Sequence, residues 1–236
     1  MTRRLPAAYL DANVNHPFTG FTPPGRVYGV VLNDLDSLQA LAPAFADAPY
    51  KAPPKAPVMY IKPANTLAPS GATVTLPPGA RRVQVGATLG VVLAAPAARL
   101  RADDAMAAVA GWRAVADLSL PHDSYYRPAI REKCFDGSCV LAATVAPAGA
   151  LRPDALRVQT FINGAQVDEW PLSRLARGIP ELLRDVTAFM TLSPGDLLLA
   201  GVRWQAPVAQ AGDQVAVRIH GVGELSFSLA LQEGKA

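Results

Sequence analysis

A long apolar run at residues 83–93 (VQVGATLGVVL) constrains the fold more than any other segment. It is rich in β-branched and small residues and carries no charge, so it predicts a central, buried strand. The dipeptide Asn163-Gly164 predicts a hairpin between two further runs. Apolar or alternating patterns predict strands at Val27–Leu32, Met59–Lys62, Val158–Ile162, Ala165–Trp170, Leu197–Val202, Gln214–Ile219 and Glu224–Leu231.

Helices are expected at residues 35–45, 105–116 and 179–190. The first is closed by prolines, and the second is an Ala-rich stretch behind the candidate N-cap residues Asp103 and Asp104. In the third, apolar side chains recur at helical spacing. The predicted class is α+β, dominated by a bent, mixed β structure with two or three helices on one side. Residues 1–24 predict an N-terminal arm without periodicity, and residues 25–236 predict one domain.

Composition excludes several classes of function. The net charge of +3 is dispersed along 236 residues, which disfavours nucleic-acid binding. No apolar run approaches the roughly 18 residues of a spanning helix, and no signal-like segment opens the chain, so we expect no membrane contact and a cytoplasmic protein. Cys134 and Cys139, the only cysteines, lack the spacing and companions of a zinc site, and they predict reduced thiols.

A polar segment, Tyr125–Gly137 (YYRPAIREKCFDG), follows Asp117, an acid within an otherwise apolar run. It carries the cations Arg127, Arg131 and Lys133. Guanidinium groups bind carboxylates through two parallel hydrogen bonds and a lysine adds a point charge, so the segment predicts the wall of a pocket for a small anion. The alternative is a solvated loop whose charges pair with one another.

These residues resemble the fumarylacetoacetate hydrolase superfamily, as do KAPPKAPVMYIKPANT at residues 51–66 and the later LSPGDLLLAG and GDQVAVRIHGVGEL runs. More narrowly, the chain is similar to the isomerase/decarboxylase branch of 4-hydroxyphenylacetate degradation. Enzymes of that branch have two homologous halves, and this chain has about the size of one half and looks most like the N-terminal one. The resemblance implies a β-rich, roll-like fold and a dimer.

The resemblance also implies Mg²⁺, held by two glutamates of an ExE strand motif and one later aspartate. Gly86 and Thr88 stand at the glutamate positions, and only the third position, Asp117, is a carboxylate. One carboxylate does not retain so strongly hydrated an ion. We therefore expect Mg²⁺ to bind weakly or not at all. The alternative role for Asp117 is a buried acid paired with Lys62 or Lys133.

Catalytic roles are expected for Lys133, which resembles the family's active-site lysine, and for Lys62, which resembles a family position near the metal and substrate. A catalytic role is also expected for His122, because histidine exchanges protons near neutral pH. Substrate binding is assigned to Tyr125, Tyr126, Arg127 and Arg131. Three alternatives stay open: a solvent-facing position at the strand edge for Lys62, a surface position for His122, and a subunit contact for the arginines.

The function implied by the resemblance is an isomerase/decarboxylase for small di- or tricarboxylates. Its substrates would be 5-oxopent-3-ene-1,2,5-tricarboxylate and 2-hydroxyhepta-2,4-diene-1,7-dioate. The alternative is a metal-poor structural subunit that pairs with a metal-bearing paralogue. The expected assembly is therefore a homodimer or a hetero-oligomer with a paralogous subunit.

Overall fold

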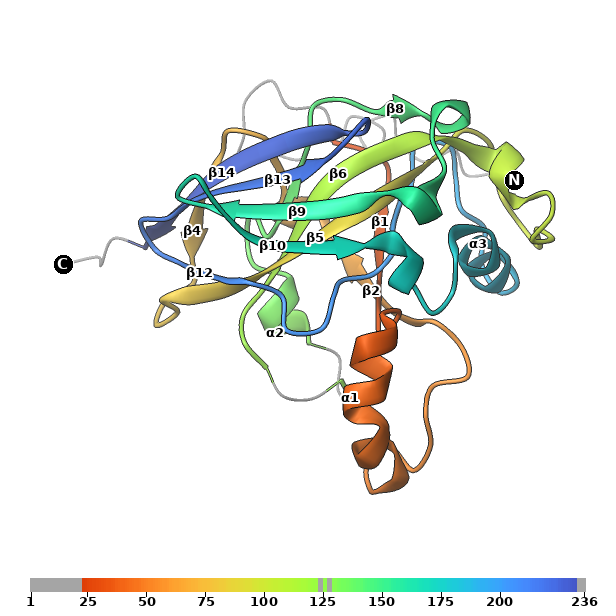
Figure 1. Cartoon of the computed structure of the whole chain (residues 1–236), viewed down its shortest axis with the longest axis horizontal. Helices are drawn as coiled ribbons and strands as arrows, with labels where there is room; N and C mark the ends of the chain where they lie inside the picture. The colour runs from red at the N-terminus through yellow and green to blue at the C-terminus, as the bar shows by residue number, and fades with distance from the viewer. Residues whose placement is uncertain (1–22, 123–124, 127–128, 233–236) are drawn as a thin grey trace, which may run out of the picture.

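The computed structural model describes residues 23–122, 125–126 and 129–232 (Figure 1). The expected arm at residues 1–24 lies almost entirely outside this part of the chain. Two β-sheets and three α-helices make up the described residues, which confirms the α+β class. None of these helices has the length and apolarity needed to cross a membrane.

The larger sheet has nine strands within the described residues. They are β1 (Val27–Val31), β2 (Val58–Lys62), β3 (Leu67–Pro69), β5 (Arg82–Leu93), β6 (Val109–Ser119), β7 (Cys139–Leu141), β8 (Ala146–Pro147), β11 (Leu197–Leu199) and β12 (Val208–Gln210). Their order is β2-β1-β11-β5-β6-β7-β3, with β12 also on β5 and β8 also on β6. The predicted central strand is confirmed, because β5 lies between β11 and β6.

The smaller sheet runs in the order β10-β9-β13-β14-β4. Its strands are β4 (Thr73–Leu76), β9 (Arg157–Ile162), β10 (Ala165–Pro171), β13 (Gln214–Ile219) and β14 (Gly223–Leu231). The predicted hairpin is confirmed: Ile162 pairs with Ala165 across the turn. Asn163 and Gly164 both have positive φ, at 52° and 81°, as a two-residue hairpin turn of this kind requires.

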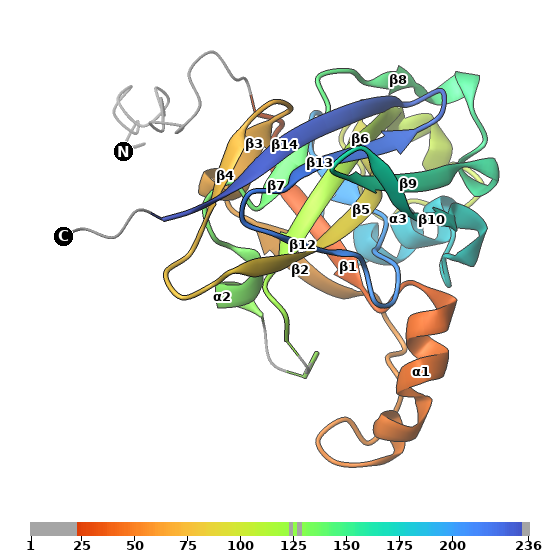
Figure 2. The same ribbon diagram turned by 60° about the vertical axis from the view of Figure 1, so that its left-hand side comes forward.

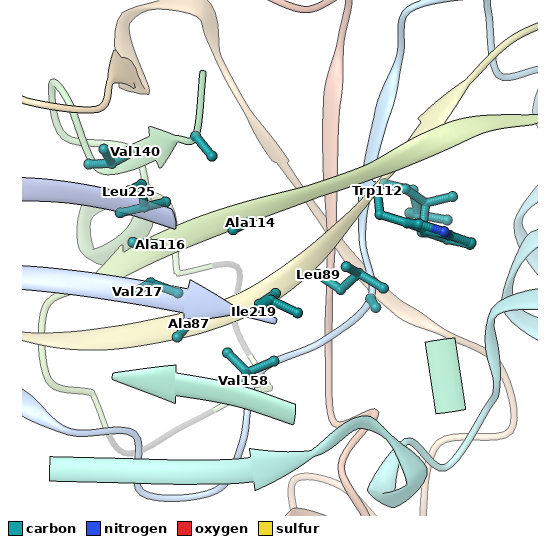
Figure 3. Close-up of a cluster of buried hydrophobic side chains, with 14 of the residues drawn as sticks. Ala87, Leu89, Trp112, Ala114, Ala116, Val140, Val158, Val217, Ile219 and Leu225 are labelled. Atoms are coloured by element: carbon teal, nitrogen blue, oxygen red, sulfur yellow. The ribbon is translucent and has the colours of Figure 1, made fainter. Parts of the chain in front are cut away.

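The core lies between the two sheets, where β5 and β6 face β9, β13 and β14 (Figure 3). Leu89 and Trp112 of the larger sheet are fully buried there, opposite Val158 and Val217 of the smaller sheet. In sheet-on-sheet packing of this kind, the side chains that face inward from both sheets interdigitate and are buried. The strands that carry the polar residues described below are therefore held rigidly.

The helices lie at the margins of the sheets. They are α1 (Leu35–Ala46), α2 (Ile130–Lys133) and α3 (Ile179–Thr187). Helix α1 projects away from the body of the molecule (Figures 1 and 2), and it begins at Asp34, whose side chain accepts a hydrogen bond from Ser37 N. Helix α3 has Pro180 in its first turn and buries the apolar face that its spacing predicted.

The helix expected at residues 105–116 is wrong. Only Ala105–Ala108 forms a short 3₁₀ turn, and the remainder belongs to β6. Alanine favours a helix by at most about 0.7 kcal/mol per residue over ordinary residues. Strand β6 gains more from its long antiparallel ladder with β5 and from burial against the smaller sheet.

The first prediction tests this core. Leu89→Ala should lower the free energy of unfolding by about 2–5 kcal/mol, because it removes a fully buried side chain and leaves a cavity. Val167→Ala is the matched control, since Val167 in β10 is 48% exposed. Urea unfolding monitored by circular dichroism measures both. Equal losses in the two variants would contradict the packing described here.

Candidate active site

The register of two strands brings the first polar residues together. In the antiparallel β5–β6 pair, Gly86 lies opposite Asp117 and Gln84 lies opposite Ser119. Because side chains alternate along a strand, all four positions share one face of the sheet. The same alternation places Tyr60 and Lys62 on one face of β2, and both contact Asp117.

The carboxylate of Asp117 is buried, with 1% of the residue exposed, and three side chains surround it. Its Oδ2 accepts hydrogen bonds from Lys133 Nζ at 2.8 Å and from the Tyr60 hydroxyl. Its Oδ1 forms an ion pair with Lys62 Nζ, also at 2.8 Å. Asp117 is therefore a buried acid that pairs with both Lys62 and Lys133. The sequence analysis named these two lysines as alternative partners.

Lys62 is buried as well, at 2% exposed, so a solvent-facing strand-edge position is wrong for it. Besides the ion pair, its ammonium donates to the carbonyls of Leu118 at 3.3 Å and Ser138 at 3.0 Å, to the Ser138 hydroxyl at 3.1 Å, and to the carbonyl of Lys133. These acceptors use the donor capacity of the ammonium. Lys62 consequently places a positive charge beside Asp117 and binds the backbone carbonyls of the neighbouring segments.

Electrostatics follows from this burial. Burial alone would raise the pKa of Asp117, but the charges of Lys133 and Lys62 outweigh it and lower the pKa to about 2. Burial lowers the pKa of Lys133, although the adjacent Asp117 opposes that shift. Burial and then the charge of Asp117 raise the pKa of Tyr60 well above its usual range, so its phenol stays a neutral donor.

Lys133 lines a cleft of about 290 Å³. The cleft is lined by Val31, Leu41, Gln84, Gly86, Asp117, Ser119, His122, Tyr125, Lys133, Val202, Arg203, Trp204, Gln205 and Ala206. Its volume is near the lower end of the roughly 300–1,000 Å³ of ligand pockets and suits a small ligand. Lys62 does not line it, so Lys133 is the lysine that a ligand would meet.

His122 lines the same cleft, with its ring edge-on to Tyr125. Its Nδ1 lies 3.1 Å from the carbonyl of Leu120 and 3.4 Å from the hydroxyl of Ser119. Donation from Nδ1 to the carbonyl leaves Nε2 as the acceptor nitrogen. Nε2 is buried and has no hydrogen-bond partner among the described residues. The surroundings therefore leave a proton-accepting atom at the cleft.

The opposite wall of the cleft, residues 202–206, is fixed by two acids, the buried Asp34 and the half-buried Asp168, which the sequence did not single out as site residues. Asp34 accepts a hydrogen bond from Trp204 N at 2.7 Å and also accepts hydrogen bonds from Nε and Nη2 of Arg174. Asp168 pairs with Arg203. Tyr60 was missed as well. Its position two residues before Lys62 on one strand was the signal that could have found it.

The predicted substrate-binding residues are spread over more than one surface. Tyr125 lines the cleft. Tyr126 is 57% exposed and lines an adjoining apolar hollow. Arg131 lies in a different hollow, next to Arg81. Arg127 falls outside the described residues.

The donor set does not fit the divalent metal ion that the resemblance implied. Both oxygens of Asp117 already face ammonium groups, which would repel a cation. A Cβ on Gly86 would lie 2.6 Å from the Asp117 carbonyl oxygen and 2.8 Å from Val202 Cγ1. Thr88 is buried, and its hydroxyl donates to the carbonyl of Gly201. In the described part of the chain, no three acidic, His or Cys side chains gather as a metal site.

Comparison with known proteins matches residues 26–230 to the sequence family described as "Fumarylacetoacetate (FAA) hydrolase C-terminal". The 4-hydroxyphenylacetate degradation bifunctional isomerase/decarboxylase of Escherichia coli is 40% identical over 197 residues. That match covers 84% of this chain and 45% of that protein. The chain thus spans about half the length of this relative and of two further curated isomerase/decarboxylases that it matches.

Solved structures show the same fold. The 5-carboxymethyl-2-hydroxymuconate delta-isomerase of Mycobacterium smegmatis has a TM-score of 0.74 and 24% identity, and the match covers 89% of this chain and 80% of that one. The fumarylpyruvate hydrolase of Pseudomonas aeruginosa, in complex with Mn²⁺ and pyruvate, has a TM-score of 0.75 and 22% identity, with 92% and 94% covered. The predicted fold type is confirmed.

The second prediction concerns acid stability. The pKa of Asp117 is about 2 in the folded protein and about 3.8 when exposed, so the ion pairs stabilise the fold above pH 4 and this contribution, on the order of 2 kcal/mol, is lost as the pH falls toward 2. In Lys133→Met the pKa of Asp117 should rise toward its unfolded value, so the loss should be smaller and should be complete at a higher pH. Urea unfolding between pH 2 and 7 measures it, with the exposed Lys55→Met as control. Identical profiles for the two variants would contradict the proposed coupling.

The third prediction tests the crowding at position 86. Gly86→Ala should destabilise the protein by about 1–3 kcal/mol, because the added Cβ meets backbone and the packed Val202. Gly149→Ala is the matched control: a Cβ there meets no atom within 4 Å, so the change should stay within about 0.5 kcal/mol. Thermal unfolding compares them. A Gly86→Ala variant as stable as the control would contradict the crowding described here.

Proposed function

Because this chain belongs to the fumarylacetoacetate hydrolase family, we propose that it isomerises or decarboxylates small carboxylates in the cleft beside Asp117. One observation carries the proposal: a buried cation, Lys133, lines the same small cleft as His122, whose Nε2 has no hydrogen-bond partner among the described residues. The substrates proposed are 5-oxopent-3-ene-1,2,5-tricarboxylate and 2-hydroxyhepta-2,4-diene-1,7-dioate. The pathway in the name of the Escherichia coli relative supports that choice.

The chemistry needs a proton carrier and a positive charge. In the isomerisation, His122 Nε2 takes a proton from the enol oxygen, and the dienol gains a proton at carbon. In the decarboxylation, the electron pair of the breaking C–C bond moves onto the neighbouring carbonyl as CO₂ leaves, and the resulting enolate is protonated at carbon. The negative charge that develops in both reactions faces Lys133.

The polar residues of the cleft wall suit the orientation of such a substrate. Gln84 and Ser119 are cross-strand neighbours beside Asp117. The amide of Gln84 offers a neutral donor, and the Ser119 hydroxyl, which donates to the Leu120 carbonyl, offers an acceptor. Arg203 lies on the opposite wall, where Asp168 holds its guanidinium. A dicarboxylate that spans the cleft can therefore place one end at Lys133 and the other at Arg203. Arg127, Arg131 and Tyr126 remain predictions for substrate binding.

For the cofactor, we propose that this chain holds Mg²⁺ weakly or not at all. The two ammonium groups at Asp117 and the absence of side-chain oxygens at Gly86 support this. The Mn²⁺ of the Pseudomonas aeruginosa structure belongs to that protein, which is 22% identical to this chain.

A second candidate function rests on the same donor set. The chain would be a metal-poor structural subunit, and a metal-bearing paralogue would perform the reaction. The two ammonium groups at Asp117 and the lack of carboxylates at Gly86 and Thr88 favour this candidate. The assembly would then be a hetero-oligomer, whereas an active chain needs at most a homodimer.

The fourth prediction distinguishes the two functions. The purified chain should convert 2-hydroxyhepta-2,4-diene-1,7-dioate, measured as loss of the ultraviolet absorbance of its diene. His122→Ala should lower kcat by roughly 10²- to 10⁴-fold, because the proton carrier is lost. His220→Ala is the matched control, since His220 is exposed and lines no part of the cleft. Turnover that appears only after a metal-bearing paralogue is added would establish the structural subunit instead.

A further inference from the structure

We infer that the ammonium group of Lys133 replaces the divalent metal ion in this cleft and binds one carboxylate or enolate oxygen of the ligand directly. The inference rests on the proposed function and assigns the electrophile of that site. It reinterprets Asp117 as the counterion that orients a lysine. It also predicts that ligand binding needs no metal.

The charge balance of the cluster supports a bound anion. Lys62 and Lys133 bring two positive charges, and Asp117 brings one negative charge. No second carboxylate among the described residues forms an ion pair with either lysine. All three residues are at most 5% exposed, so the remaining positive charge is held away from water. A buried charge without a partner is costly, and one anionic oxygen at the cleft would neutralise it.

The geometry selects Lys133 as the group that receives this anion. The ammonium of Lys62 is occupied by backbone carbonyls and by Ser138, and it lies outside the cleft. Lys133 Nζ has one hydrogen bond to Asp117 and lies 4.4 Å from the centre of the Tyr60 ring. An ammonium has three donors, so capacity remains for a ligand in the cleft.

The packing around Asp117 also disfavours the two glutamates that a metal site would need at positions 86 and 88. Packing of Val202 and the Asp117 backbone fills the space that a side chain on Gly86 would need. The carbonyl of Gly201 holds the hydroxyl of Thr88. Thr88 thus binds Gly201, and Gly86 packs against Val202, where the wall at residues 202–206 begins. The wall and the ammonium pair together form a metal-free anion site.

The fifth prediction uses oxalate, an unreactive dianion that presents the adjacent oxygens of a 2-oxo acid. Isothermal titration calorimetry of the wild-type chain should give the same Kd for oxalate in EDTA and in Mn²⁺. Lys133→Met should weaken binding roughly 10- to 100-fold, as expected for loss of a charged hydrogen bond. Lys133→Met keeps the balanced Lys62–Asp117 pair, and its folding is checked by thermal melting. Lys55→Met, which removes an exposed lysine, should bind like the wild type.

Two results would overturn the inference. One is oxalate binding by the wild type that disappears in EDTA and returns with Mn²⁺. The other is undiminished oxalate binding by folded Lys133→Met in EDTA. Because oxalate is not turned over, a chain that binds it through Lys133 but converts no diene keeps this inference and refutes the proposed function. An active chain that needs Mn²⁺ to bind oxalate keeps the proposed function and refutes this inference.

Discussion

The contact of Asp117 with two ammonium groups is the interaction on which the site depends. It joins β2, β6 and α2 at one point, because Lys62, Asp117 and Lys133 each come from a different element. Lys62 extends the junction to the turn before β7 through Ser138. Removing one partner from a buried cluster of this kind typically costs about 3–5 kcal/mol, since a charge is left without compensation. The same cluster therefore holds the sheet edge to the helix and sets the polarity of the cleft.

One side of the cleft is a rigid pair of strands, and the other side is a loop held in place by polar contacts. The rigid side is the β5–β6 ladder, whose opposite face is packed into the core between the sheets. The loop side is the wall at residues 202–206, which has no regular structure of its own and is fixed by Asp34 and Asp168. Asp34 also caps α1, whose Leu41 reaches the cleft. One buried carboxylate thus couples the start of a projecting helix to the position of the opposing wall.

Local patterns predicted the fold where burial and local preference agreed. The β5 run, the Asn163-Gly164 hairpin and the amphipathic α3 are all confirmed. The local patterns failed at residues 105–116, where an alanine-rich sequence favours a helix but pairing with β5 imposes a strand. Strands β3, β4, β7, β8 and β12 were also missed. Each has only two to four residues, and their partners are distant in sequence, so no periodic pattern indicates them.

The sequence by itself determined which chemistry is available: an acid in an apolar strand, a lysine-bearing polar segment after it, and Gly86 and Thr88 where a metal site would need glutamates. It also determined the family, through motifs that run along most of the chain. Only the tertiary structure decided how these groups combine, because strand register and long-range pairing set their distances. Register placed Gly86 against Asp117 and left no room for a side chain there. In the folded chain Lys62 and Lys133, which are far apart in the sequence, both pair with the carboxylate of Asp117. Of these two lysines, only Lys133 lines the cleft.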